Sequence, residues 1–427
     1  MMILTAAVLH ASGENAITST ADSFGRLWGR SILAEYDIKL KDRYGIFAFY
    51  GDELSVAEKV DFYAEYSARG KKYIDIEPSK CSLEEYRLSD TENFTAQLRE
   101  AVLTDTKPLQ TERKKSAAVG SSEGNAEAEG KAEDKAVGRA RENRYIKSER
   151  IIAALPSGGK EGGISVLRLA ERLKEGFSAE AVVNSAAENI YMFRFFKDCM
   201  NDRRLGESFF ENEIEYILTG KLDDAKAKNK VKSNLTLLRN SLNLAYLYSC
   251  DEKRNAALAA AELIMPEAPM LAQALILEGW AYMEARNDIK ILYAGREVPI
   301  LKKDENWAVS LDNLLTAEYG IDSSGAEAGT GSEAGSDSGS KAEKASASET
   351  ASNYLSPAKI EGKNYEDYLR ILAAALPQET ALLRMMDIIQ INMKYLYCDY
   401  FLMYDYYVGL KYSIVINDRE HEFEEKY

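Results

Sequence analysis

The sequence predicts an α+β protein that is predominantly α-helical. It has an N-terminal stalk helix, a small sheet formed from N- and C-terminal strands, a large helical insertion and two disordered loops. Three observations support this prediction. Apolar residues recur at three- and four-residue spacing through most of the middle of the chain, which is typical of amphipathic helices. Residues 406–417 alternate strictly, as a half-buried strand does. The other strand-like patterns all lie near the N-terminus.

Residues 1–40 are predicted to form the N-terminal helix and stalk. The apolar run covers only residues 1–9, whereas a spanning helix needs roughly 20 apolar residues, and no basic region precedes it as in a signal peptide. Two interpretations remain open: an ordinary helix start, or the last turns of a truncated membrane anchor that begins upstream. The stalk itself is indicated by an amphipathic pattern at Ile17, Ala21, Phe24, Trp28 and Ile32.

Four segments have the composition of strands. They are residues 44–50, 71–77, 82–88 and 406–417, and Pro78 ends the second. A C-terminal strand with one apolar face needs partners, and the only other strand-like segments are N-terminal. We therefore expect the two ends of the chain to meet in one antiparallel or mixed sheet, so that residues 41–110 and 401–427 form a small sheet domain.

Two segments contain too little apolar surface to offset the entropy of ordering them. Residues 111–143 are rich in Ala, Glu, Lys, Gly and Ser, and residues 322–353 are almost free of large apolar side chains. Both are predicted to be disordered loops. The glycine pairs at 158–159 and 162–163 lack the context of a phosphate-binding loop and are assigned to a flexible turn.

Between the two loops the chain is predicted to be helical over residues 144–321, and the same helical domain continues over residues 354–400. Asn364, followed by Glu366 and Asp367, is expected to be an N-cap with its first helical turn. About five or six helices, packed through their apolar faces, are expected to form a bundle. The helical segments are 207–219, 228–249, 253–265, 268–288 and 378–397.

Composition limits the classes of function. The 427 residues carry a formal net charge of −15, which argues against nucleic acid as the main partner because phosphate binding needs a basic face. The four cysteines form no C-x-x-C pair, so no zinc ribbon or dithiol motif is present. They are Cys81, Cys199, Cys250 and Cys398. A disulfide between Cys199 and Cys250 stays open for a domain outside the cell.

The strongest pattern for carboxylate chemistry is the pair Glu211 and Glu215, four residues apart on a predicted helix face. A di-metal site in a helical bundle also needs Glu-x-x-His pairs, and the two histidines, His10 and His421, lie near the ends of the chain. A solvated acidic face is the favoured interpretation. We expect no enzyme, no catalytic residue, no cofactor and no metal, and a carboxylate-dependent hydrolase remains the minor alternative.

Residues 31–51, SILAEYDIKLKDRYGIFAFYG, join the predicted stalk helix to the first strand. This segment resembles the junction found in Tad/Flp-type pilus-associated envelope proteins of Gram-positive bacteria, which have a TadE/TadG-like N-terminal architecture. Four further segments resemble an uncharacterised Gram-positive family, a domain of unknown function linked to Tad-like pilus machinery, and the likeness covers most of residues 31–416. They are ENEIEYILTGK, LLRNSLNLAYLYSCDEKRNAALAAA, GREVPILKKDENWAVSLDNLL and NYEDYLRILAAALPQETALLRMMDIIQINM.

The resemblance implies a function but no activity. It implies a non-enzymatic, membrane-anchored component or accessory of a Tad-like pilus or secretion system on the extracytoplasmic side of the cell membrane. Members carry a full apolar helix before the stalk, so the membrane contact requires that the full-length start lies upstream. The partners would be proteins of that assembly and not nucleic acid. The alternative, from a different class, is a soluble helical module that binds a protein partner.

Five junction residues are the best candidates for structural importance: Tyr36, Asp37, Arg43, Tyr44 and Gly45. Two interpretations remain open. They form part of an interaction surface, or they cap the stalk helix and turn the chain into the sheet, in which case Gly45 supplies backbone freedom.

Overall fold

The computed structural model describes residues 2–70, 74–104, 154–167, 169–170, 187–200, 208–319 and 362–427. It confirms an α+β fold that is predominantly helical, with small antiparallel sheets. The chain divides into two compact units. The first contains residues 1–164, 180–228 and 376–427, and the second contains residues 165–179 and 229–375. The predicted disordered loops, 111–143 and 322–353, lie outside the described residues.

The sheet of the first unit joins the two ends of the chain, as the sequence predicts. Strand β4 (Gly409–Ile416) pairs antiparallel with β2 (Lys80–Ser82) on one side and with β5 (Arg419–Lys426) on the other. A separate two-stranded sheet pairs β1 (Phe49–Tyr50) with β3 (Tyr406–Tyr407). The β4–β5 hairpin closes through Asn417 and Asp418, which both have positive φ, as a two-residue hairpin turn of type I′ requires.

The N-terminal strand predictions need correction. In the predicted strand 44–50 only Phe49 and Tyr50 are in a strand, because residues 38–44 form the short helix α2 (Ile38–Tyr44). In the predicted strand 82–88 the strand ends at Ser82 and a 3₁₀ turn, η1 (Glu84–Tyr86), follows. Residues 71–73 of the segment 71–77 lie outside the described residues, and Ile76 makes an isolated bridge to Ile416.

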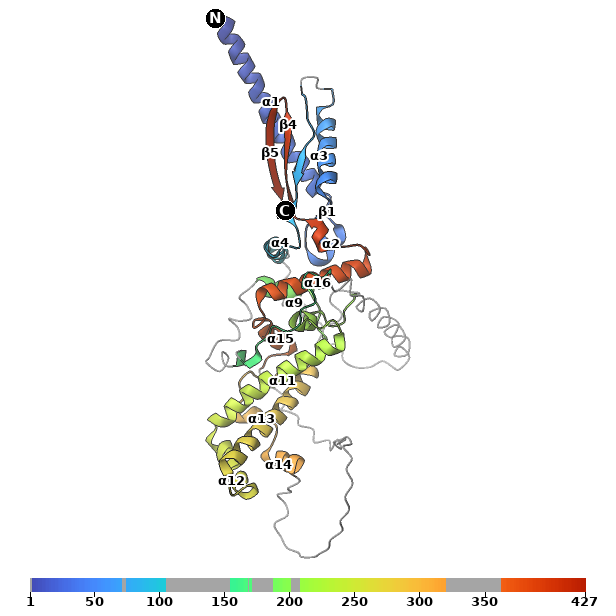
Figure 1. Ribbon diagram of the computed structural model, residues 1–427. Coiled ribbons are helices and arrows are strands. Elements are labelled where there is room, and N and C mark those ends of the chain that lie inside the picture. The colour runs from blue at the N-terminus through green and yellow to red at the C-terminus, as the bar shows by residue number, and fades with distance from the viewer. Residues whose placement is uncertain are drawn as a thin grey trace, which may run out of the picture. The chain divides into compact units, whose positions relative to one another are not determined.

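Helix α1 (Met2–Leu33) runs alongside the β4–β5 hairpin, and its N-terminal turns extend beyond the end of the hairpin (Figure 1). Its backbone comes close to β5 because Gly25 faces the ring of Phe423 and Gly29 faces Glu425. The Tyr412 hydroxyl donates a hydrogen bond to the Gly25 carbonyl. Helix α3 (Glu53–Ala68) packs on both α1 and β2, so α1 is held between a strand and a helix.

The helical part of the first unit surrounds α16 (Gln378–Leu396). Between Ala381 and Met393 every residue of α16 except Leu383 is classed as buried. The helices packed around α16 within this unit include α2, α4 and α10. The remaining elements of the unit are α4 (Thr91–Thr104), α9 (Ala187–Phe195), α10 (Glu213–Thr219) and the 3₁₀ turn η4 (Met403–Asp405).

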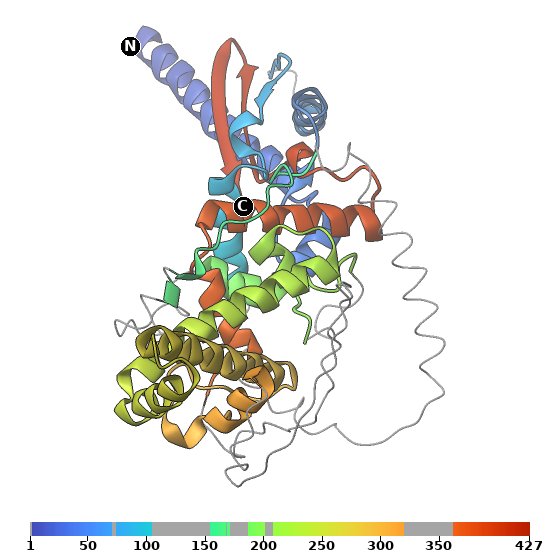
Figure 2. The same ribbon diagram turned by 60° about the horizontal axis from the view of Figure 1, so that its bottom comes forward.

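The second unit is helical, and Figure 2 shows its helices packed together. Its core joins α12 and α13 around Trp280, Leu277 and Ala261. Asn364 caps α15, and its Oδ1 accepts a hydrogen bond from the Asp367 N–H at 2.8 Å, as predicted. The elements are α11 (Asp224–Ser249, which begins in the first unit), α12 (Asp251–Ile264), α13 (Pro269–Tyr293), η3 (Asp304–Asn306), α14 (Leu311–Tyr319) and α15 (Tyr365–Ala373).

Within the part of the chain that the structure describes, no helix combines the length and the apolar character needed to cross a membrane.

The two α1 glycines provide the first test. A Cβ at Gly25 would lie 2.1 Å from Cζ of Phe423, whereas a Cβ at Gly29 would meet the flexible side chain of Glu425 at 2.9 Å. We expect Gly25→Ala to lower the free energy of unfolding by about 1 kcal/mol or more, because overpacking costs more than the gain in helix propensity returns. Gly29→Ala, the matched control, should leave it unchanged or raise it by up to about 1 kcal/mol.

Urea denaturation of both variants measures this difference. Phe423→Leu in the Gly25→Ala background should restore stability. Equal effects of the two alanines would contradict a close contact between α1 and β5.

Candidate functional site

Asp37 and Gly45 bound the short helix α2, which lies between the stalk helix and the sheets. Asp37 is the N-cap, and its Oδ1 accepts hydrogen bonds from the N–H groups of Lys39 and Leu40 at 2.8 and 3.0 Å. Its Oδ2 accepts a hydrogen bond from the Tyr406 hydroxyl at 3.1 Å. The residues expected to cap the stalk helix therefore cap a separate helix, because α1 has already ended at Leu33.

Gly45 ends α2 with a φ of 68°, and its N–H donates to the carbonyl of Lys41 at 2.8 Å. A left-handed residue at this position favours glycine. Space is also limited, since a Cβ would lie 2.9 Å from Cβ of Ala101. Tyr36, just before the cap, packs edge to face on Phe47 with ring centroids 5.0 Å apart.

Tyr44 is the centre of a buried polar network, which we call the Tyr44 network. Its hydroxyl oxygen accepts hydrogen bonds from Asn392 Nδ2 at 2.9 Å and from Arg43 Nε at 3.1 Å. Asn392 Nδ2 also donates to Oε1 of Glu213 at 2.7 Å, and Oε2 of Glu213 accepts from the Lys197 N–H at 3.0 Å. The network joins α2, α10 and α16.

Electrostatics of the Tyr44 network are set by burial. Glu213 is 1% exposed and Tyr44 is 1% exposed. Removal from water disfavours the charged form of each group, and it raises the pKa of Glu213 and the pKa of Tyr44 above their ordinary values. The hydrogen bonds from Lys197 and Asn392 oppose this rise at Glu213. The buried side chains of Tyr44, Glu213 and Asn392 therefore hold α2, α10 and α16 together.

A second buried cluster lies one to two turns earlier on α16. Asp387 accepts hydrogen bonds from the Tyr216 hydroxyl at 2.7 Å and from the Ser157 N–H at 3.0 Å, and burial raises its pKa. Arg384 donates to the carbonyls of Ile217, Lys160 and Gly162 at 2.7–3.0 Å. The glycines at 158, 159, 162 and 163 all have positive φ, as expected for a turn, and this turn supplies two of the three carbonyls that Arg384 binds.

The second unit contains its own charged cluster, in which two cations balance two carboxylates. Arg239 Nε donates to Asp288 Oδ2 at 3.0 Å, and both side chains are fully buried. Lys302 Nζ lies 2.6 Å from Asp288 Oδ1 and also pairs with Glu284. Glu284 in turn accepts a hydrogen bond from the Val309 N–H at 2.8 Å. Each of these four buried charges is paired with an opposite charge, which is the condition for burying charges in a core.

The predicted acidic pair does not form a face of one helix. Helix α10 begins at Glu213, so Glu211 lies before it. Glu215 is fully buried, and its Oε1 accepts a hydrogen bond from the Cys199 N–H at 3.1 Å. The interpretation as a solvated acidic face is therefore wrong for Glu215. The sequence pattern did not reveal this, because burial of α10 depends on its packing against α16.

No group of three or more His, Cys, Asp or Glu side chains is placed to hold a metal ion among the described residues. The four cysteines are free thiols, so the structure contains no Cys199–Cys250 disulfide. His421 lies on β5, with Nδ1 3.2 Å from Oδ1 of Asp22 on α1, and the side chain of His10 lies outside the described part.

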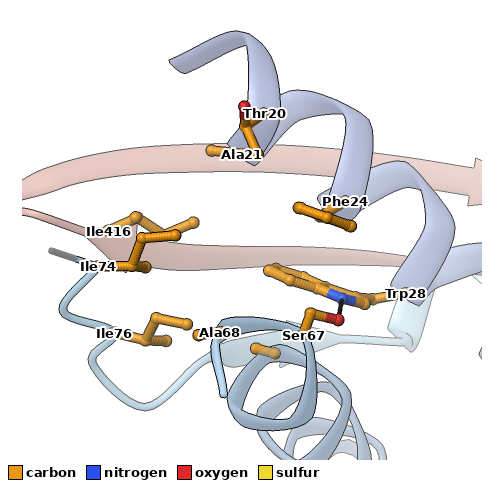
Figure 3. Close-up of a pocket in the computed structure, with 10 residues that line it drawn as sticks. Thr20, Ala21, Phe24, Trp28, Ser67, Ala68, Ile74, Ile76 and Ile416 are labelled. Carbon is orange, nitrogen blue, oxygen red and sulfur yellow. Dashed lines mark hydrogen bonds between the residues drawn. The ribbon is translucent and has the colours of Figure 1, made fainter. Parts of the chain in front are cut away.

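An apolar pocket lies between α1, α3 and β4 (Figure 3). Phe24 and Trp28 of α1 face Ile74, Ile76 and Ile416 across it. Trp28 Nε1 donates a hydrogen bond to the Ser67 hydroxyl at 3.0 Å. The cavity volume is about 20 Å³, which is room for about one water molecule. The pocket is thus a small packing gap between these elements and is too small for an organic ligand.

A family model described as "Family of unknown function (DUF5702)" matches residues 140–418, well over half of the chain. The chain belongs to this family. The match includes α10, α16 and the helices of the second unit, and it leaves out α1 and the junction residues. The match confirms the expectation that the chain contains a domain of unknown function. No curated protein and no solved structure matches the chain.

The buried carboxyl group of Glu213 predicts a pH dependence of the free energy of unfolding. Because burial raises its folded pKa above the ordinary 4.5, the folded state binds this proton more tightly than the unfolded chain. The contribution of Glu213 to stability is therefore greatest at low pH and decreases as pH rises from the unfolded to the folded pKa. Between pH 4 and pH 7 the free energy of unfolding of Glu213→Gln should rise relative to that of the wild type.

Urea denaturation across this pH range measures the effect. Glu84→Gln, which changes an exposed carboxylate, is the control and should show no such trend. A difference between wild type and Glu213→Gln that is the same at every pH would contradict a raised pKa.

The charged cluster of the second unit predicts a large loss from one substitution. Arg239→Met removes one of the two cations paired with the buried Asp288 and leaves one positive charge, on Lys302, against two buried carboxylates. This should cost about 3–5 kcal/mol of unfolding free energy. Lys232→Met removes a cation from the exposed face of the same helix and should change stability by less than about 0.5 kcal/mol. Denaturation followed by tryptophan fluorescence measures the loss, since two of the three tryptophans, Trp280 and Trp307, lie in this unit. A small effect of Arg239→Met would show that the cluster is dispensable.

Proposed function

We propose that this chain is a non-enzymatic, membrane-anchored component or accessory of a Tad-like pilus or secretion system, displayed on the extracytoplasmic side and acting through protein partners. The observation that carries the proposal is the arrangement of α1. This 32-residue helix packs along the β4–β5 hairpin with its C-terminal part while its N-terminal turns extend beyond it. Such a helix suits an element that leaves a membrane and continues into a folded domain.

The contacts of α1 support a load-carrying stalk. Among the side chains of α1 that the structure describes, the buried ones lie between Ala21 and Leu33. Hydrogen bonds link α1 to the C-terminal hairpin and to the residue that follows: Tyr412 donates to the Gly25 carbonyl, Arg30 Nε donates to Glu425 Oε2 on β5 at 3.4 Å, and Tyr427 donates to the Leu33 carbonyl. The stalk is thereby joined to the last strand of the chain, and force applied to α1 would pass into the sheet.

The buried acids support a non-enzymatic role. Glu213 and Asp387 accept hydrogen bonds from within the first unit, and Asp288 and Glu284 are paired with cations in the second. Each carboxylate therefore has a structural task. The resemblance of residues 31–51 to the junction of Tad/Flp-type envelope proteins supplies the cellular context of the proposal.

The alternative is a soluble helical module that binds a protein partner. It is favoured by exposed apolar side chains on the outer face of α13, including Leu271, Leu275 and Tyr282, since apolar side chains gathered on one exposed face are typical of interaction surfaces.

The test is the location and true N-terminus of the native protein. Membrane and soluble fractions of the source cells are separated, and the N-terminal peptide is mapped by mass spectrometry. The proposal predicts a protein in the membrane fraction with an apolar N-terminal segment, digested by protease added to intact protoplasts. A cytoplasmic marker protein serves as control and should be cut only after lysis. Protein found in the cytosol would overturn the anchor and favour the soluble module.

The link to the pilus is tested separately by deleting the coding sequence. Electron microscopy of the deletion strain should show fewer surface filaments, or secretion assays should show less exported protein. Unchanged filaments and secretion would overturn the assembly role even for a membrane protein.

A further inference from the structure

The outer face of α11 and α13 in the second unit carries a groove of about 700 Å³. It is separate from the buried networks described above, and its existence does not depend on membrane anchoring. Side chains of both helices line it, with cations, hydroxyls and tyrosines alongside aliphatic groups. The lining residues are Asn229, Lys232, Ser233, Thr236, Leu237, Asn240, Glu278, Tyr282, Arg286, Ile289, Lys290 and Tyr293.

The groove is basic although the chain as a whole has a net charge of −15. Lys232, Arg286 and Lys290 are exposed, and within the described residues none of them forms an ion pair. The one carboxylate in the lining is Glu278, whose Oε1 accepts a hydrogen bond from Asn240 Nδ2 at 2.6 Å. Three cations against one carboxylate make this face attractive to acidic groups.

Along α13 the exposed face changes from apolar to basic. Leu271 and Leu275, near its start, are 59% and 54% exposed, and Tyr282 is 47% exposed. Arg286 and Lys290 follow toward its end. The three- and four-residue spacing places these side chains on one stripe of the helix. From Leu271 to Tyr293 the stripe is about 33 Å long at 1.5 Å per residue.

The floor of the groove is held rigidly. Arg239 and Asn243 of α11 both donate hydrogen bonds to Asp288 of α13, at 3.0 and 3.1 Å. Asn240 adds the third link, to Glu278. A surface that is already formed loses little conformational entropy on binding.

We propose that this groove, together with the exposed stripe of α13 that continues beyond it to Leu275 and Leu271, binds an amphipathic helix of a partner protein. Apolar residues of that helix would lie against Leu271, Leu275 and Tyr282, and acidic residues against Arg286, Lys290 and Lys232. Charge complementarity selects an acidic occupant, and the apolar end of the stripe selects side chains that a purely polar anion lacks. A straight stripe of this length fits a helix of up to about six turns, the mode in which amphipathic helices bind hydrophobic grooves.

The first experiment uses a synthetic helical peptide that carries leucines in its first half and glutamates in its second half, all on one face. Fluorescence anisotropy measures its binding to the full chain. Two control peptides replace the glutamates by lysine or the leucines by serine. We expect the acidic amphipathic peptide to bind at least about 10-fold more tightly than either control, since each loses one class of contact.

Variants locate the site. Arg286→Glu and Leu275→Ser should each weaken binding by about 10-fold. Two matched controls change exposed residues outside both the groove lining and the α13 stripe, Lys230→Glu on α11 and Leu263→Ser on α12, and should leave it within about 2-fold. Circular dichroism checks that all four remain folded. If the control variants lost as much peptide binding, or if poly-glutamate bound as tightly as the peptide, the binding would be non-specific electrostatic attraction. Either result would overturn the proposal.

The second experiment identifies the native occupant. A photo-crosslinking amino acid replaces Tyr282 in the groove or Tyr248, an exposed tyrosine of α11 outside the lining, and the chain is expressed in its own cells. Cross-linking at position 282 alone, to a segment with apolar and acidic residues at three- and four-residue spacing, is the expected result. No adduct, or an adduct to nucleic acid or to a segment without that pattern, overturns the proposal. Cytosolic location of the chain would leave this outcome unaffected.

Discussion

Burial of the polar side chains of α16 is the constraint on which the first unit depends. Asn392 links the helix to Tyr44 and Glu213, while Gln390 binds the carbonyl of Ala154 and the N–H of Met403. Together with Arg384 and Asp387, these side chains hold segments from both ends and the middle of the chain. A buried polar group without a partner costs about 1–3 kcal/mol, so these segments fit against α16 only where their donors and acceptors match.

In the second unit the buried polar groups are charged, and their partners are opposite charges. Arg239, Asp288, Lys302 and Glu284 neutralise one another inside the helices, and the cations on the outer face of α13 are left for solvent or a partner. The charged residues of this unit are therefore of two kinds, buried and exposed. Buried charges fix the positions of α11 and α13, and exposed charges give the surface between them its sign.

The stalk and the groove give the two units different roles in the proposed assembly. Gly25 and Gly29 let α1 approach β5, so the stalk is continuous with the sheet. The groove of the second unit would then offer a binding face for a protein partner. The family match includes α16 and the helices of the second unit but not α1, so the proposed anchor rests on the junction and on the packing of α1.

The sequence by itself determined the elements whose signal is local. Period-two alternation located β4 and three-four spacing located α16, because both patterns depend only on the local spacing of apolar residues. Asn364 marked the start of α15, because an N-cap side chain bonds to the first turn of its own helix. It did not reveal β5, whose outer face is a row of glutamates, or α2, which is too short for a periodic signal. Tertiary structure alone decided that Glu213, Glu215 and Arg239 are buried. Their carboxylate or guanidinium groups leave water only when partners distant in the sequence supply hydrogen bonds and opposite charge, and no local pattern records those partners.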